Sequence, residues 1–179
     1  VCRHFHLSLQ SGCDATLKAM NRKYDTARFY EAMQLLRKHF PDCGLTCDVI
    51  VGFPGESEQH QTETLEFLKK ARFSDAHIFP YSRRHGTPAD KMDGQLDRAT
   101  KAKRSKQAQT VVAETRDEFL RSMIGKTLPV LFETKHGKSW LGHSDNYLEV
   151  MAEGVELRGT VRNVSIHTVS DGILVGNVI

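Results

Sequence analysis

The sequence lacks several features that would assign it to a specialised class. No apolar run approaches the roughly 20 residues needed to cross a bilayer, and there is no basic-then-apolar secretory signal. Charge of one sign is not in large excess, because 25 Lys and Arg stand against 22 Asp and Glu, for a net charge of +3. This charge permits an acidic partner without requiring one. We therefore expect an ordinary cytoplasmic globular protein with no membrane partner.

Clustered cysteines are also missing. The four cysteines, Cys2, Cys13, Cys43 and Cys47, include no Cys-x-x-Cys pair. Zinc or iron–sulfur ligation needs several ligands at tight spacing, so we predict no metal site from these four. Reduced, unpaired thiols are the expected state in the cytoplasm.

What the sequence does contain is organised around Asp48–Glu56. The β-branched residues Val49–Val51 predict a buried strand, and Gly52, Pro54 and Gly55 predict a sharp turn after it. Ser57 is a candidate N-cap for the helix that follows. A glycine turn at the carboxyl end of a parallel strand often holds a ligand, although a tight connection alone would use the same residues.

Strand and helix patterns alternate through the first part of the chain. Alternating polarity predicts strands, and three- to four-residue spacing of apolar residues predicts helices. The order favours a parallel sheet, either open or curled into a barrel. The predicted strands are 4–10, 45–52 and 76–81, and the predicted helices are 15–22, with Asp14 as its cap, 26–40 and 57–72.

The predicted strands also carry polar residues in alternate positions. His6, Ser8 and Gln10 share one face, and Asp48, His77 and Tyr81 occupy comparable positions in the other two strands. A parallel sheet covered on both sides would be apolar on both, so a polar face fits a barrel interior that holds a ligand. Satisfied core or rim histidines are the alternative.

Loops after the three strands should meet at one rim, near residues 10, 53 and 82, because the carboxyl ends of parallel strands share an edge. Arg83 and Arg84 lie in the third loop, where they could bind phosphate or remain solvated. A long helix is predicted over 95–124, and its segment 98–106 is basic. Such a run can contact nucleic acid or simply form a solvated face.

The last third changes character, with five short predicted strands at 128–134, 139–143, 147–152, 159–169 and 173–179. This spacing predicts a small β-barrel, and we place the domains at 1–125 and 126–179. Small barrels often bind oligonucleotides through aromatic and basic side chains. Candidates are Lys138, Trp140, Tyr147, Arg158 and Arg162, although Trp140 could instead fill the barrel core.

Four segments together resemble the radical S-adenosylmethionine (SAM) methylthiotransferases: His6–Gly12, Met20–Tyr24, Asp48–Glu56 and Phe79–Ala89. Residues 127–179 resemble that family's RNA-binding TRAM domain. The resemblance implies an α/β fold, a partial parallel-stranded radical-SAM barrel followed by a small all-β TRAM barrel.

Phe79–Ser82 and Gly142–Tyr147 look most like the subfamily that adds a methylthio group to C2 of N6-threonylcarbamoyladenosine 37 in the tRNA anticodon stem-loop. Relatives that modify isopentenyladenosine in tRNA, or an aspartate of a ribosomal protein, are the alternatives.

The family's Cys-x-x-x-Cys-x-x-Cys motif is not in this sequence. We therefore expect the chain to correspond to the carboxyl-terminal half of such an enzyme, with the 4Fe-4S clusters held by a missing amino-terminal part. Alone it should be inactive and contain no catalytic residue. A non-catalytic RNA-binding module, or a purely structural domain, remains possible for this chain by itself.

The resemblance also implies site residues for SAM. Gln10 and its turn match the strand that contacts the methionine or ribose. Ile50 and Gly52 match the motif that flanks the adenine, and Tyr81 matches a strand end near the adenine. In this set the cofactor-binding candidates are Gln10, Ser11, Asp48, Ile50, Gly52, Phe53 and Tyr81. The family often has Glu three residues after Gly52, where this chain has Gly55. This departure puts a carboxylate role for Glu56 in doubt.

Overall fold

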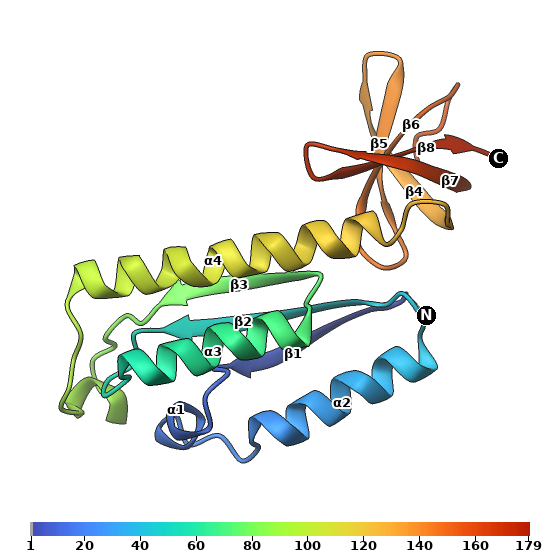
Figure 1. The fold of residues 1–179 in the computed structure, drawn as a ribbon. Helices are drawn as coiled ribbons and strands as arrows, with labels where there is room; N and C mark the ends of the chain where they lie inside the picture. Colours follow the sequence, from blue (N-terminus) through green and yellow to red (C-terminus); the bar gives the residue numbers. More distant parts are fainter. Residues whose placement is uncertain (1) are drawn as a thin grey trace.

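Three parallel strands form the first part of the structure, a computed structural model that describes residues 2–179. Their order is β1 (His4–Gln10), β2 (Gly44–Val51) and β3 (Asp75–Pro80) (Figure 1). The helices are α1 (Asp14–Ala19), α2 (Thr26–His39), α3 (Glu58–Ala71) and α4 (Arg98–Arg121), with a short 3-10 helix at Pro88–Lys91. The predicted alternation of strands and helices is confirmed. Within residues 2–179, no helix combines the length and apolarity that a bilayer crossing requires.

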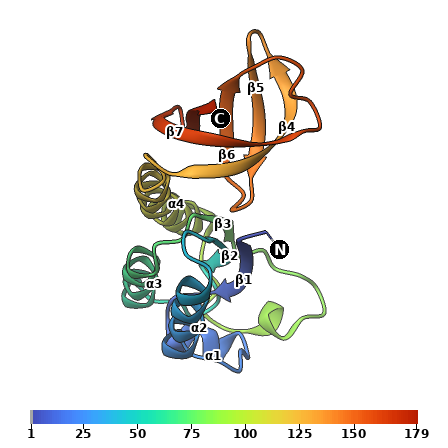
Figure 2. The ribbon, with the colours of Figure 1, turned by 90° about the vertical axis from the view of Figure 1, so that its right-hand side faces the viewer.

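Helices α2, α3 and α4 cover one face of this sheet (Figure 2). In β2, Leu45, Cys47, Val49 and Val51 are buried, whereas Thr46, Asp48 and Ile50 between them are only partly buried. The buried set packs against Met33 of α2, Leu68 of α3 and Ala108 of α4 in one cluster. The opposite side, here called the open face, carries His4, His6, Thr46, Asp48, His77 and Phe79. Period-two alternation therefore gives the sheet one packed face and one polar, aromatic face.

A closed five-stranded barrel forms the rest of the chain, as the strand spacing predicts. Its strands are β4 (Thr127–His136), β5 (Ser139–Ser144), β6 (Glu149–Glu153), β7 (Val161–Ser170) and β8 (Ile173–Val178). They close in the order β4-β5-β6-β8-β7, and all pairs are antiparallel except β6 with β8. Its core contains Phe132, Trp140 and Ile166. The domain boundary near residue 125 stays a prediction.

One predicted helix cap is wrong. Helix α1 begins at Asp14 itself, with Cys13 in the N-cap position. The Asp14 carboxylate instead accepts a hydrogen bond from the Thr26 N–H at 2.8 Å, so it fastens the start of α2 beside α1. The cap predicted at Ser57 is confirmed, because its hydroxyl accepts the His60 N–H at 3.1 Å.

The fourth helix is shorter than the predicted 95–124. It begins at Arg98 because the Asp97 carboxylate caps it by accepting the Thr100 N–H at 2.9 Å. It ends at Arg121, and Gly125 has φ of +84°, which suits glycine and turns the chain into β4.

The barrel contacts the sheet where β1 and β2 begin. Arg3 donates to both oxygens of Asp145 at 2.7 and 2.9 Å, and the Asn146 amide donates to the Asp42 carbonyl at 3.0 Å. Lys126 pairs with the Asp42 carboxylate at 2.5 Å. The barrel therefore lies at the amino ends of the strands, opposite the ends where their loops begin (Figure 1).

Candidate functional site

The carboxyl ends of the three strands enclose a cavity of about 530 Å³, here called the strand-end pocket. Gln10 ends β1, Asp48 and Ile50 lie on β2, and Phe79 and Tyr81 lie at the end of β3. Arg84, Thr87 and Ala89 of the following loop complete its wall. An apolar wall with a few polar groups is typical of a pocket for a small organic ligand.

Two of the predicted residues shape the rim without lining this pocket. Phe53 is buried and packs edge-on against Tyr81, with ring centroids 5.2 Å apart. Gly52 has φ of +72°, and a Cβ there would lie 2.6 Å from Cγ of Lys101. The segments near residues 10, 53 and 81 thus meet at one end of the sheet.

Ser11 does not reach the pocket. It is fully buried, its hydroxyl accepts the Cys13 N–H at 3.2 Å, and it lies 3.3 Å from the Thr64 hydroxyl. These contacts hold the turn between β1 and α1. Gln10 beside it has φ of +69°, so this turn sets the direction from which Gln10 enters the pocket.

A buried ion pair beneath the turn was missed by the sequence reasoning. The Glu56 carboxylate accepts the Gly52 N–H at 2.8 Å and pairs with Arg104 at 2.7 Å, and both charged side chains are almost fully buried. Arg104 also donates to the Glu56 carbonyl at 2.9 Å and to the Glu58 carboxylate at 2.9 Å. Glu56 therefore does have a carboxylate role, which is to hold the turn.

The signal for Arg104 was present in the helical spacing. Arg104 precedes Ala108 and Val112 by four and eight residues, so all three share the face of α4 that packs on the sheet. Interpreting 98–106 as one basic face overlooked this position. The pairing partner, however, lies 48 residues away in sequence.

A hydrogen-bonded row crosses the open face from the pocket toward the barrel. Asp48 lies 3.4 Å from His6 Nε2, and the Thr46 hydroxyl lies 3.0 Å from both His6 Nδ1 and His4 Nε2. Burial, with the neighbouring His6, lowers the pKa of His4. The neutral form of His4 is therefore favoured in the folded protein. His4 and His6 thus have hydrogen-bonding neighbours within the chain, which agrees with the alternative that the histidines of the polar face are satisfied core or rim residues.

The predicted RNA-binding residues fall in separate places. Arg84 lines the strand-end pocket, while Arg83 pairs with Asp90 at 2.9 Å. Lys138, Trp140 and Arg158 line an open cavity of about 980 Å³ at the barrel tip.

Trp140 lies in the barrel core and is only 7% exposed, and its indole N–H donates to the Gly154 carbonyl at 3.0 Å. This placement favours the core role over stacking on a base. Tyr147 lies elsewhere, stacked on His4 and His143, and Arg162 is exposed on β7.

Comparison with known proteins agrees with this geometry. Residues 1–68 match the model of the radical SAM superfamily, and this segment contains β1, β2 and most of α3. The threonylcarbamoyladenosine tRNA methylthiotransferase MtaB of Bacillus subtilis is 36% identical over 87% of this chain and 36% of its own length.

Two tRNA-2-methylthio-N(6)-dimethylallyladenosine synthases are also similar. That of Alkaliphilus oremlandii is 44% identical over 74% of this chain and 28% of its own length. That of Acetivibrio thermocellus is 36% identical over 100% of this chain and 38% of its own length. Most of the chain is therefore similar to tRNA methylthiotransferases, and it spans less than two fifths of the length of these three relatives.

The pocket fits the organic cofactor of this family. Gln10 and Asp48 offer polar groups, Ile50 and Phe79 offer apolar surface, and the buried Tyr81 hydroxyl has no hydrogen-bond partner within residues 2–179. A buried hydroxyl of this kind is costly unless a ligand or water satisfies it.

The same residues do not fit an iron–sulfur cluster. Across residues 2–179, no three or more His, Cys, Asp or Glu side chains are grouped to hold a metal ion. Burial raises the pKa of the thiols of Cys13, Cys43 and Cys47, most strongly for Cys47. Burial thus favours the protonated thiol over the thiolate that ligates metals.

Proposed function

We propose that this chain is the sheet-and-barrel portion of a tRNA methylthiotransferase that modifies C2 of N6-threonylcarbamoyladenosine 37 in the anticodon stem-loop. The observation that supports this most directly is the strand-end pocket, which opens beside a polar sheet face in a chain that also carries a closed barrel. Similarity to the Bacillus subtilis relative, named for that substrate, supports the choice of base. Such a substrate would place the protein in the cytoplasm.

In this proposal the pocket residues bind and orient S-adenosylmethionine. Gln10 and Asp48 supply hydrogen bonds for its polar end, and Ile50 and Tyr81 flank its adenine. Gly52 and Phe53 fix the turn, with Ser11 beneath Gln10. Bound SAM and a 4Fe-4S cluster supply the radical chemistry, and the ligands of the cluster would come from outside this chain. The residues of this chain hold and orient the cofactor, and they exclude water.

The barrel contributes the RNA contact in this proposal. Lys138 and Arg158 surround the barrel-tip cavity, and Arg162 is exposed on β7. Arg84, at the pocket wall, lies where a bound nucleotide would approach. Exposed cations can contact RNA phosphates without reading the sequence.

A second candidate is modification of dimethylallyladenosine. The Alkaliphilus oremlandii relative, named for that product, is 44% identical over its shorter matched region. The two bases differ chemically, because the threonylcarbamoyl group carries a carboxylate and the dimethylallyl group is uncharged and apolar. Affinity for stem-loops that carry each base distinguishes the two candidates.

Separate titrations of the chain with SAM and with anticodon stem-loops test the proposal. We expect saturable SAM binding, and RNA binding that weakens steeply with salt. RNA binding without SAM binding would instead support an RNA-binding module with no cofactor role. Binding of neither ligand would contradict both and leave a structural domain.

A further inference from the structure

A second hollow, of about 410 Å³, lies on the other side of Tyr81 from the strand-end pocket. Tyr81, Ser82 and Arg83 form one wall after β3, and Arg98 and Lys101 of α4 form the other. We call these five residues the basic hollow. Pro80, Tyr81 and Ser82 line both cavities, so a group in the basic hollow would lie directly beside a ligand in the strand-end pocket.

The charges in the basic hollow are mostly uncompensated. Its lining contains no acidic residue, and neither Arg98 nor Lys101 forms an ion pair with any part of the chain that the structure describes. Arg83 is paired with Asp90 at 2.9 Å. The nearby Asp97 carboxylate is occupied as the cap of α4, bonded to the Thr100 hydroxyl at 2.7 Å and its N–H at 2.9 Å. Arg98 and Lys101 therefore lie without ion-pair partners in the described chain at the amino end of a 24-residue helix, whose first turn is already capped by the Asp97 carboxylate.

Lys101 is held in place, unlike a typical surface lysine. It is half-buried, its stem lies against Gly52, and its ammonium lies 5.2 Å from the centre of the Tyr81 ring. One turn later, the buried Arg104–Glu56 pair fixes the helix to the turn after β2. The Lys101 ammonium is thus positioned relative to the pocket before any ligand arrives, which lowers the entropy lost on binding.

We infer that the basic hollow binds an oxyanion of the RNA substrate, next to the S-adenosylmethionine that occupies the strand-end pocket. This inference rests on the proposed function. A backbone phosphate and the carboxylate of a threonylcarbamoyl group share this chemistry, and both pair well with Arg and Lys. The basic segment of α4 is thereby divided by role: Arg98 and Lys101 face the ligand, Arg104 is structural, and Lys103 and Lys106 are solvated.

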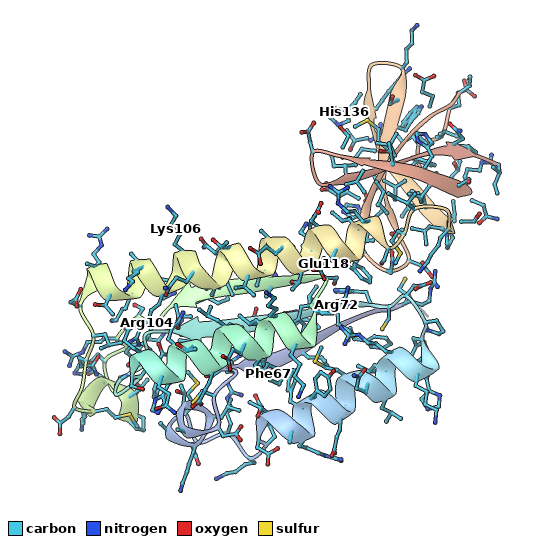
Figure 3. The ribbon with its side chains drawn as sticks, viewed as in Figure 1. Phe67, Arg72, Arg104, Lys106, Glu118 and His136 are labelled. Atoms are coloured by element: carbon cyan, nitrogen blue, oxygen red, sulfur yellow. The ribbon has the colours of Figure 1, made fainter. Side chains whose placement is uncertain are left out.

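The test compares Arg98→Gln and Lys101→Gln with Lys106→Gln in the full 179-residue chain. Lys106 is exposed on the same helix and points away from the sheet, so it is a matched loss of one charge (Figure 3). Affinity is measured against salt for three anticodon stem-loops that carry threonylcarbamoyladenosine, dimethylallyladenosine or unmodified adenosine. Thermal unfolding of each variant checks that it remains folded. Because Arg98 is exposed, Arg98→Gln removes no packing.

We expect Arg98→Gln and Lys101→Gln each to weaken binding by roughly three- to tenfold at low salt, and Lys106→Gln to change it less than twofold. An equal loss for all three RNAs, with the salt slope reduced by about 0.7 to 0.9, identifies a phosphate. A loss confined to the threonylcarbamoyl stem-loop identifies its carboxylate.

This inference would be overturned if the wild type binds RNA and both Arg98→Gln and Lys101→Gln bind it as tightly as Lys106→Gln does. The proposed function would then still stand. Failure of the wild-type chain to bind any stem-loop would overturn the RNA role itself.

Discussion

At the residue scale, Tyr81 is the side chain that the two cavities share. Its ring contacts Phe53 and the Lys101 ammonium, and its buried hydroxyl has no partner within residues 2–179. The ring therefore contributes to packing, while the hydroxyl contributes nothing visible to the stability of this state. A ligand or water that reached this hydroxyl would supply the missing hydrogen bond.

Tyr81→Phe separates these two roles. We expect its melting temperature to equal or slightly exceed that of the wild type, because an unsatisfied buried hydroxyl is removed. We expect SAM affinity to fall by roughly tenfold, about 1.4 kcal/mol, if the hydroxyl bonds the cofactor. Calorimetric titration and thermal unfolding measure the two effects. Unchanged SAM affinity would show that only the ring matters.

At the element scale, helix α4 is fastened to the sheet along its length. Arg104 near its start pairs with Glu56, Arg116 pairs with Asp75 at 2.7 Å, and Glu118 pairs with Arg72 at 3.0 Å (Figure 3). Only the first of these pairs is buried. Exposed pairs contribute little to stability, whereas breaking a buried pair leaves a charge without a partner.

Arg104→Met should therefore destabilise the chain by about 3 to 5 kcal/mol, because Glu56 would remain buried with only the Gly52 N–H as a partner. Urea unfolding measures this change. Lys106→Met on the exposed side of the same helix is the control, with an expected effect within about 0.5 kcal/mol. Similar unfolding midpoints for the two variants would refute a structural role for the buried pair.

At the scale of the whole molecule, α4 links two regions that lie far apart. Its 24 residues span about 36 Å, with the basic hollow at its start and the barrel after its end. The turn Ser144–Tyr147 of the barrel contacts the beginnings of β1 and β2, where a Cβ on Gly44 would collide with the Asn146 carbonyl. The relative position of pocket and barrel is therefore set by close packing as well as by the chain connection.

His4 makes this packing sensitive to pH, because it stacks on Tyr147 of the barrel at 4.8 Å. Burial and the neighbouring His6 lower the pKa of His4 in the folded state, so the unfolded state takes up its proton more readily. The stabilising contribution is complete above the ordinary histidine pKa near 6.5, and it is lost as pH falls below that value. We expect melting temperature to fall as pH drops below about 6.5, and to fall less in His4→Phe. An equal fall in both proteins would assign the acid sensitivity to other groups.

Much of the fold could be predicted from local patterns. Alternation in β1 and β2, the Ser57 cap and the turn residues between the barrel strands indicate their elements directly, since these signals depend on neighbours in sequence. The prediction of Asp14 as the cap was wrong because Cys13 and Asp14 compete for the same helix start. The hydrogen bond from the Thr26 N–H to Asp14 decided between them. The roles of Glu56 and Trp140 likewise depended on partners that are remote in sequence or on the barrel's interior.

Residue types and their short-range spacing are enough to predict the order of strands and helices, the polar alternation of the sheet and the family resemblance. Tertiary structure alone decided which cations are buried, which are paired and which face a cavity. Arg98, Lys101, Arg104 and Lys106 look alike in the sequence, and they differ only because a helix turns each toward a different environment and because Glu56 meets one of them.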